Sequence, residues 1–331
     1  MSVQPLAAEI KGDLENRVSA LSAKLAAARE NVHKVIFGQD EAIGLCLTAI
    51  LSGGHFLLMG LPGLGKTRLV DTLGTVMGFE HKRVQCTPDL MPADIIGSEI
   101  LGSDRSFQFV KGPVFCQLLM ADEINRASPR TQSALLQAMQ EYQVSVGGVT
   151  YDLPRPFHVM ATQNPLEQEG TYPLPEAQLD RFMLQIDIGY PSATAERQMM
   201  LATTGAREDK AAQVFTAEEM LEAQRLIRRL PIGQQVVDGI LQLVQAGRPE
   251  QSSLAAVKKH VSWGPGPRAS QALMLAARAK ALLEGRLAPS LDDVVAIAPA
   301  VLRHRMALHF SARAEGLALA DIIRQICMTI A

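Results

Sequence analysis

The sequence predicts an α/β domain built on a parallel sheet and followed by an all-helical domain. Three short apolar runs, at 55–59, 117–121 and 157–161, are separated by helical patterns. This alternation is typical of a parallel sheet covered by helices, because its buried strands are apolar on both faces. After about Val214 the apolar runs cease and the remaining patterns are helical. A chain of 331 residues is long enough for both domains to bury a core of their own.

Two helices should precede the first strand. In the first, apolar residues recur at steps of four, three and four, which predicts a helix with a single apolar face. These residues are Leu14, Val18, Leu21 and Leu25. The second should cover about 41–51 and end at Gly53-Gly54. We therefore expect an N-terminal helical segment at 1–35, the α/β core at 36–205 and the helical domain at 206–331. The stretch 191–210 fits a helix, a linker or both.

Two β-hairpins should interrupt the α/β pattern. Apolar residues alternate along 144–153 around Gly147-Gly148, which is a strong signal for a two-residue turn. A weaker hairpin is expected near 100–110, turning at 102–105.

Three later helices carry recognisable starts. Ser128 precedes a proline and is expected to cap a helix that contributes its apolar side to the core. In the C-terminal region, Thr216 with Glu219 and Ser290 with Asp293 have the spacing of capping boxes.

Composition excludes several classes of protein. No apolar run reaches the roughly 18 residues that span a bilayer, and the N-terminus lacks a signal-peptide pattern, so we expect a cytoplasmic protein without membrane insertion. A net charge of −2 gives no general attraction to nucleic acid. The four cysteines lack C-x-x-C spacing and the seven histidines lack H-E-x-x-H spacing. These patterns favour buried thiols over a disulfide framework or a metal knuckle.

A glycine-rich loop gives the strongest functional signal. Residues 60–67 read Gly-Leu-Pro-Gly-Leu-Gly-Lys-Thr and fit G-x-x-x-x-G-K-[ST], between an expected strand and an expected helix. An ordinary glycine turn would match this pattern by accident in about one chain in a hundred. In such a loop, backbone N–H groups surround ATP phosphates, Lys66 neutralises their charge and Thr67 offers its hydroxyl to Mg²⁺. The expected nucleotide contacts are Gly60, Pro62, Gly63, Leu64, Gly65, Lys66, Thr67 and Arg68.

Two carboxylates follow the second apolar run. Asp122 and Glu123 should emerge at the carboxyl edge of a buried strand, where open α/β sheets place their ligands. Asp122 would hold Mg²⁺, largely through water. Glu123 would polarise the attacking water, because hydrolysis needs a proton acceptor near the γ-phosphate. An isolated Asp-Glu pair would be read as a solvated turn, but its place beside the phosphate-binding loop favours the catalytic interpretation.

Several further segments share one order with these motifs. Asp122 opens Asp-Glu-Ile-Asn-Arg-Ala, and Thr-Gln-Ser-Ala-Leu-Leu follows at 131–136. The other segments are Gly53-Gly54-His55, Met139-Gln140-Glu141, Ala-Thr-Gln-Asn-Pro at 161–165, the stretch 169–182 that ends in Leu179-Asp180-Arg181-Phe182, and Pro267-Arg268-Ala269. Together they resemble the MoxR family of AAA+ ATPases, from about Ile36 to near the C-terminus.

The resemblance implies a role for three more residues. Asn164 matches the sensor-1 asparagine, whose neutral amide can donate to a γ-phosphate oxygen and orient water. An Asn-Pro turn also accounts for it. Arg181 matches the arginine finger that serves a neighbouring subunit, and Arg268 matches sensor 2 at the start of a lid helix. Around Arg268 the chain reads Gly-Pro-Gly-Pro-Arg-Ala, where the family usually has Gly-Ala-Ser-Pro-Arg-Ala.

Two other pairs have open interpretations. The segment of Val35, Ile36, Phe37, Gly38 and Gln39 matches the one that borders the adenine ring in similar proteins, and simple core packing explains Ile36 and Phe37 equally well. Arg126 and Arg130 could lie at a subunit interface, although solvated charge at a helix start is the simpler explanation.

For the whole protein, the resemblance implies an AAA+ core with hairpin insertions and an all-α lid, assembled in a homo-oligomeric ring of six subunits. Members of the MoxR family look like chaperones that use ATP and Mg²⁺ to remodel client proteins, together with von Willebrand factor A-domain proteins. The alternatives are the ATPase subunit of a metal chelatase and a motor stimulated by nucleic acid. The match over 122–141 disfavours the first, and the nearly uncharged tip at 147–148 disfavours the second.

Overall fold

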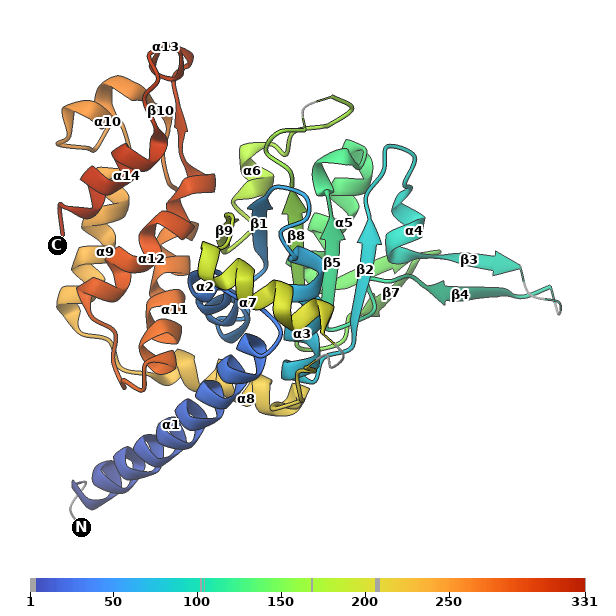
Figure 1. The fold of residues 1–331 in the computed structure, drawn as a ribbon, viewed down its shortest axis with the longest axis horizontal. Coiled ribbons are helices and arrows are strands. Elements are labelled where there is room, and N and C mark those ends of the chain that lie inside the picture. Colours follow the sequence, from blue (N-terminus) through green and yellow to red (C-terminus); the bar gives the residue numbers. More distant parts are fainter. Residues whose placement is uncertain (1–3, 102, 104, 168, 206–208, 331) are drawn as a thin grey trace. The chain divides into compact units, whose positions relative to one another are not determined.

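The computed structural model describes residues 4–101, 103, 105–167, 169–205 and 209–330. The chain divides into two compact units, one formed by Val32–Leu221 and the other by Met1–Asn31 together with Glu222–Ala331 (Figure 1). The division falls within helix α8 (Ala217–Arg229). The boundary suggested by the sequence, between 205 and 206, touches residues outside the described part and stays a prediction.

A five-stranded parallel sheet forms the centre of the first unit, in the order β2-β5-β8-β1-β9 (Figure 1). The three predicted strands are present, and each begins one residue later than expected. The strands are β1 (Phe56–Gly60), β2 (His81–Gln85), β5 (Leu118–Asp122), β8 (His158–Gln163) and β9 (Leu184–Ile188). Because all five are parallel, the carboxyl ends of β1, β5 and β8 meet at one edge of the sheet.

Helices follow the strands along the first unit. They are α2 (Asp40–Leu51), α3 (Lys66–Met77), α4 (Pro92–Ile96), α5 (Pro129–Glu141), α6 (Glu176–Leu179) and α7 (Ala193–Thr204), with the 3₁₀ turn η1 at Ile124–Arg126. α2 packs on β9 and α3 on β5. The predicted cap of α5 is confirmed, since the Ser128 hydroxyl accepts a hydrogen bond from the Thr131 N–H at 3.3 Å.

Both predicted hairpins are present. The first pairs β3 (Gly97–Leu101) with β4 (Phe107–Lys111), and the second pairs β6 (Gln143–Val146) with β7 (Val149–Asp152). Of the turn expected at 102–105, residues 102 and 104 lie outside the described part of the chain. The Phe109 ring stacks on Tyr151 with centroids 4.2 Å apart, so an aromatic contact joins the two hairpins.

Two buried histidines tie the start of β1 to the rest of this core. His55 accepts a hydrogen bond from the Val159 N–H at 3.0 Å, and its other ring nitrogen lies 3.0 Å from the Met139 carbonyl oxygen. His158 bonds the Gly54 carbonyl through Nδ1 at 2.9 Å. Burial, helped by repulsion from His158, lowers the pKa of His55 to about 3, and burial lowers the pKa of His158 to about 4. Both rings are therefore neutral near pH 7.

We expect stability to fall between pH 6.5 and pH 5. Unfolded histidines titrate near 6.5, so below that pH the unfolded chain binds protons that folded His55 and His158 exclude. Each histidine should cost about 1.4 kcal/mol of unfolding free energy per pH unit once the pH lies well below 6.5. Urea unfolding at pH 7.5, 6 and 5 measures this loss. His158→Gln, which keeps a side-chain donor for Gly54, should show a shallower dependence. Equal slopes in variant and wild type would contradict the assignment.

The second unit is helical, as predicted, with one addition. Its helices are α1 (Gln4–His33), α9 (Gln234–Ala246), α10 (Ala255–His260), α11 (Pro267–Leu283), α12 (Leu291–Leu302), α13 (Phe310–Ala314) and α14 (Leu319–Cys327), with η2 at Arg303–Arg305. α12 packs against α9, α11 and α14. The addition is a two-stranded antiparallel ladder of β10 (Val261–Trp263) and β11 (Ala307–Leu308), which is too short to produce an alternating sequence pattern.

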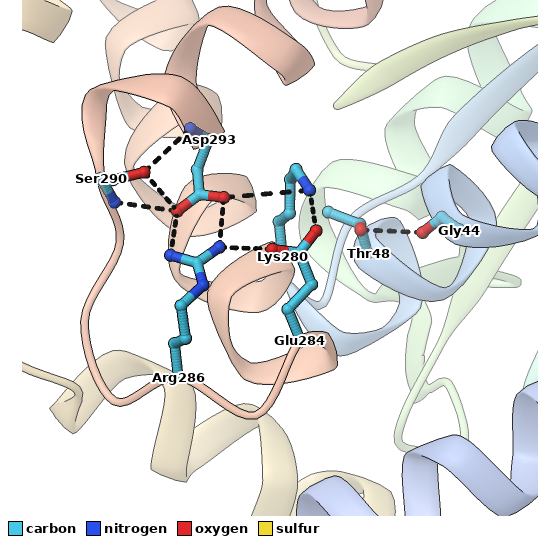
Figure 2. Close-up of polar contacts among 7 residues, drawn as sticks. All are labelled: Gly44, Thr48, Lys280, Glu284, Arg286, Ser290 and Asp293. Atoms are coloured by element: carbon cyan, nitrogen blue, oxygen red, sulfur yellow. Dashed lines mark hydrogen bonds and ion pairs between the residues drawn. The ribbon is translucent and has the colours of Figure 1, made fainter.

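An ionic cluster around Asp293 fixes the loop between α11 and α12 (Figure 2). The two carboxylate oxygens of Asp293 lie 2.7 and 2.6 Å from the two terminal nitrogens of Arg286. The predicted capping box is confirmed, because Ser290 donates its N–H to Asp293 and accepts the N–H of Asp293 in return. Burial raises the pKa of Asp293, but the hydrogen bonds from Arg286 and Ser290 outweigh it, so the net shift is downward. The carboxylate stays ionised and holds the start of α12.

The described residues also bear on what the composition indicated about membrane spans, metal sites and cysteines. None of their helices is long and apolar enough to cross a membrane, and within them no three histidine, cysteine, aspartate or glutamate side chains gather as a metal site. The four cysteines are buried free thiols, as expected: Cys46, Cys86, Cys116 and Cys327.

Candidate active site

The glycine-rich loop connects the end of β1 to the start of α3. Gly63 and Gly65 have φ values of 82° and 76°, a left-handed conformation that glycine adopts without strain. A Cβ atom at either position would meet nothing within 4 Å, so the backbone here faces open space. The loop can therefore admit a phosphate group close to its N–H groups and to the N-terminus of α3.

Lys66 lies at the first position of α3 and is buried. Its Nζ donates to the Gly60 carbonyl oxygen at 2.7 Å, across the base of the loop. Burial lowers the pKa of Lys66, while Asp122 and Glu123 act in the opposite direction. The ammonium group thus lies inside its own loop and within the field of the two carboxylates. There it could stabilise the negative charge of phosphate oxygens.

Asp122 is the last residue of β5 and is buried. One carboxylate oxygen accepts the Thr162 hydroxyl at 2.6 Å, and the other lies 2.6 Å from an Arg83 nitrogen. The Thr162 oxygen also accepts the N–H of Glu123 at 2.9 Å. A single hydroxyl on β8 therefore orients both acidic residues.

Glu123 has a left-handed backbone conformation, and two neighbouring side chains contact its carboxylate. Its φ and ψ are 55° and 52°, which is the left-handed region. Its Oε2 accepts from Gln85 Nε2 at 3.0 Å and lies 3.2 Å from Arg126 Nη1. The left-handed turn ends β5 and starts η1, so the carboxylate leaves the strand at the carboxyl edge of the sheet.

Asn164 follows β8, the strand that lies between β1 and β5. Its Oδ1 accepts the Leu166 N–H at 3.2 Å, and its Nδ2 lies 3.4 Å from Glu167 Oε2. Strand order thus brings the glycine-rich loop, the acidic pair and Asn164 to the same edge of the sheet.

A cavity of about 500 Å³ lies beside the glycine-rich loop, within the first unit. Ile36 and Phe37 line it, together with loop residues 62–65 and Arg68. The Gln39 amide donates to the Leu64 carbonyl oxygen at 2.9 Å and thereby ties the 35–39 segment to the loop. This volume is within the usual range for a small-molecule site. Val35 and Gln39, from the same expected segment, also line it, whereas the sequence did not indicate the rest of the lining, formed by Tyr190, Pro191, Glu196, Met199 and Thr203.

The two remaining arginines lie elsewhere. Arg181 follows α6, and its Nη1 donates to the Leu136 carbonyl oxygen of α5 at 2.8 Å, while its buried Nε has no hydrogen-bond partner. Arg268 is exposed in the first turn of α11, in the second unit. Contacts at the sheet edge therefore join Asp122 to Glu123, and Arg126 links Glu123 to the Asn164 loop, whereas Arg181 points to α5.

Sequence reasoning missed Arg83, Gln85 and Thr162, and it left Arg126 open between a subunit interface and solvated charge at a helix start. Side chains two residues apart on a strand share a face, so Arg83 and Gln85 both reach the acidic pair on the neighbouring strand β5. β2 reads His-Lys-Arg-Val-Gln and lacks the apolar run by which β1, β5 and β8 were identified. If β2 had been recognised as the strand beside β5, the contacts of Arg83 and Gln85 with the acidic pair could have been predicted.

Comparisons with known proteins identify the family of the chain and its fold. Residues 55–184 match the ATPase family associated with various cellular activities (AAA), and residues 254–326 match the AAA lid domain. A Mycobacterium tuberculosis protein named Chaperone MoxR1 is 43% identical over 91% of this chain and 80% of its own length. Protein MoxR of Methylorubrum extorquens is 33% identical over 92% of this chain and 94% of its length. A crystal structure of a candidate ATPase from Cytophaga hutchinsonii superposes with a TM-score of 0.90 at 38% identity, covering 97% of this chain and 98% of that one.

Proposed function

We propose that this chain, which belongs to the AAA ATPase family and within it to the MoxR proteins, binds ATP with Mg²⁺ and hydrolyses it to ADP and phosphate. One observation carries the proposal. The buried ammonium of Lys66 lies at the end of β1 and within the field of Asp122 and Glu123 at the end of β5, with Asn164 following the strand between them. These positions support a phosphate-neutralising role for Lys66, a metal-binding role for Asp122 and a proton-accepting role for Glu123.

In the proposed reaction, N–H groups of the glycine-rich loop and Lys66 hold the phosphates, and Ile36 and Phe37 border the base. Thr67 and Asp122 would hold Mg²⁺, largely through water, and the metal supplies positive charge against the phosphate oxygens when bound. Glu123 accepts a proton from the attacking water, and Asn164 orients that water. Arg268, as sensor 2, would respond from the lid to the bound nucleotide.

Oligomerisation and clients extend the proposal. We infer a cytoplasmic homo-oligomeric ring, of six subunits, in which Arg181 serves the site of the neighbouring subunit. The engagement of Arg181 with α5, away from the acidic pair of its own chain, supports that assignment. We further infer that hydrolysis drives chaperone-like remodelling of client proteins, with von Willebrand factor A-domain proteins as partners. The name of the M. tuberculosis relative, Chaperone MoxR1, supports this role.

Lys66→Ala should weaken ATP binding by about 10- to 150-fold without unfolding the chain. The substitution removes a charged hydrogen-bond donor to the phosphates, and hydrogen bonds to charged groups are worth about 1.5–3 kcal/mol. Calorimetric titration with ATP and Mg²⁺ measures the loss, and circular dichroism checks the fold. Lys210→Ala, at an exposed lysine of the same unit, is the matched control and should bind as wild type does. Equal ATP affinity in Lys66→Ala would overturn the site.

A further inference from the structure

A second cavity lies between helices α12 and α14, which pack on each other in the second unit (Figure 1). Its lining residues recur at helical spacing, so one face of each helix borders it. They are Val295, Pro299 and Arg303 from α12 and η2, and Ala320, Ile323, Arg324 and Cys327 from α14. This cavity differs from the one beside the glycine-rich loop, which belongs to the first unit.

The walls of the cavity between α12 and α14 are apolar, and its volume suits one side chain. Val295, Pro299 and Ile323 present hydrocarbon, and Cys327 is a buried free thiol, which packs as a small apolar group. The volume of about 250 Å³ lies below the range of about 300–1,000 Å³ that is usual for sites of larger ligands. Ala320 is exposed, so the cavity can be reached from solvent. A single aliphatic side chain fits this space in size and polarity.

Two arginines add positive charge to the cavity. Arg303 and Arg324 line it, and none of the described lining residues is acidic. Arg324 Nη1 lies 3.0 Å from Asp321 Oδ1, but the two side chains are 68% and 49% exposed. An ion pair so exposed contributes little free energy, so Arg324 can turn toward a bound anion at small cost. Guanidinium groups beside an apolar cavity suit a carboxylate that is attached to an aliphatic group.

Pro299 leaves a hydrogen-bond acceptor in the wall of the cavity. In a regular helix, the N–H of residue 299 would donate to the carbonyl oxygen of residue 295. Proline has no N–H, so the Val295 carbonyl lacks this helical hydrogen bond. Val295 and Pro299 both line the cavity, so this carbonyl belongs to its wall. It can accept an N–H from an occupant.

The last residue of a polypeptide carries the three groups that these features match. Its carboxylate suits Arg303 and Arg324, an aliphatic side chain suits the apolar walls, and its N–H suits the Val295 carbonyl. We propose that the cavity between α12 and α14 binds the C-terminal residue of a partner protein whose chain ends in an aliphatic residue such as leucine. The inference goes beyond ATP hydrolysis and does not depend on it. A small branched carboxylate lacks the N–H, so the Val295 carbonyl favours a peptide.

Fluorescence anisotropy with a labelled peptide tests the site on the full-length chain. The probe is fluorescein-Gly-Ser-Gly-Ser-Leu with a free carboxylate, and its binding should saturate with a Kd below about 1 mM. Amidation of the terminus should weaken binding about 10-fold or more, because it removes the charge that the arginines recognise. Glycine in place of the last leucine should have an effect of similar size, because it removes the buried side chain. Absence of saturation, or equal binding of the amidated peptide, would overturn the proposal.

Variants of the lining residues show where the peptide binds. Arg303→Gln and Arg324→Gln should each weaken binding by about 10-fold. Ala320→Phe fills the cavity from its exposed side and should remove binding, while circular dichroism checks the fold. Arg313→Gln and Ala314→Phe, at exposed positions of α13 in the same unit, are the matched controls and should bind as wild type does. Wild-type affinity in both lining arginine variants would contradict the assignment.

Competition and sedimentation distinguish the other occupants. 4-Methylpentanoate has the carboxylate and the branched chain but no N–H, so N-acetyl-leucine should displace the peptide about two- to tenfold better. Equal or better displacement by 4-methylpentanoate would assign the cavity to a small carboxylate and overturn the proposal. Ala320→Phe should sediment as wild type does, and a smaller assembly would show that a second copy of this chain occupies the cavity instead.

The proposal can fail independently of the ATPase. Lys66→Ala should bind the peptide with wild-type affinity, because Lys66 belongs to the other unit and touches no residue of this cavity. Loss of ATP binding or hydrolysis would count against the proposed function alone, whereas loss of peptide binding in wild type would count against this inference alone.

Discussion

Arg181→Ala is expected to bind ATP nearly as wild type does and to hydrolyse it about 10³- to 10⁵-fold more slowly. An arginine at the γ-phosphate stabilises charge that develops in the transition state, and fingers in related phosphoryl chemistry contribute factors of this size. In this chain the Arg181 guanidinium bonds the Leu136 carbonyl on α5, and its Nε is buried without a partner. These contacts do not join Arg181 to the Asp122–Glu123 pair of its own subunit. Calorimetry measures the binding, and phosphate release measures the rate.

Mixing experiments show which subunit the arginine serves. Lys66→Ala should bind ATP weakly but keeps its arginine, whereas Arg181→Ala keeps its glycine-rich loop. If Arg181 acts on a neighbour, mixed assemblies will contain interfaces with one intact loop and one intact arginine, and turnover will partly return. Wild-type specific activity should also rise with protein concentration as rings assemble. If subunit exchange has been verified and neither rescue nor concentration dependence is observed, Arg181 does not act on a neighbouring subunit.

Glu123→Gln should bind ATP with wild-type affinity and turn it over about 10²- to 10⁴-fold more slowly. The amide keeps the volume of the side chain and a hydrogen-bond acceptor for Gln85, but it accepts a proton poorly. Single-turnover assays with labelled ATP measure the rate, and a filter assay measures the retained nucleotide. Glu141→Gln, at an exposed residue of α5, is the matched control and should retain wild-type turnover.

Wild-type turnover by Glu123→Gln would show that another group accepts the proton. The slow variant has a second use, since an assembly that retains ATP should also retain its clients. Pull-down with Glu123→Gln in the presence of ATP would then identify the proteins on which the ring acts.

The sequence predicted the part of the fold whose physics is local. Strands buried on both faces leave apolar runs, and Ser128, Thr216 and Ser290 leave capping patterns that the structure confirms. β2 was missed because it is polar, β9 because its apolar residues alternate with polar ones, and the β10–β11 ladder because it is short. The order β5-β8-β1 could not be read either, since strand neighbours depend on contacts between distant residues.

The candidate site divides in the same way. Residues 60–67 and the acidic pair form contiguous motifs, so their place at a sheet edge follows from the sequence. Thr162 does not stand out, because a threonine in an apolar strand is ordinary. Its importance comes from the distance of 2.6 Å to Asp122, which only pairing of β5 with β8 creates. The contacts of Arg126 are likewise invisible before Glu167 is placed beside it.

The left-handed backbone at Glu123 has an evolutionary consequence. Conformations with φ near 55° cost most side chains about 1–2 kcal/mol, whereas glycine and, to a lesser degree, asparagine adopt them readily. The residue that suits the fold at this position is therefore not the residue that suits hydrolysis. In lineages where such a chain came to serve only as a scaffold, drift toward glycine or asparagine at this position would relieve the backbone. If Glu123 is the proton acceptor that we propose, turnover has kept a glutamate there against its conformational preference.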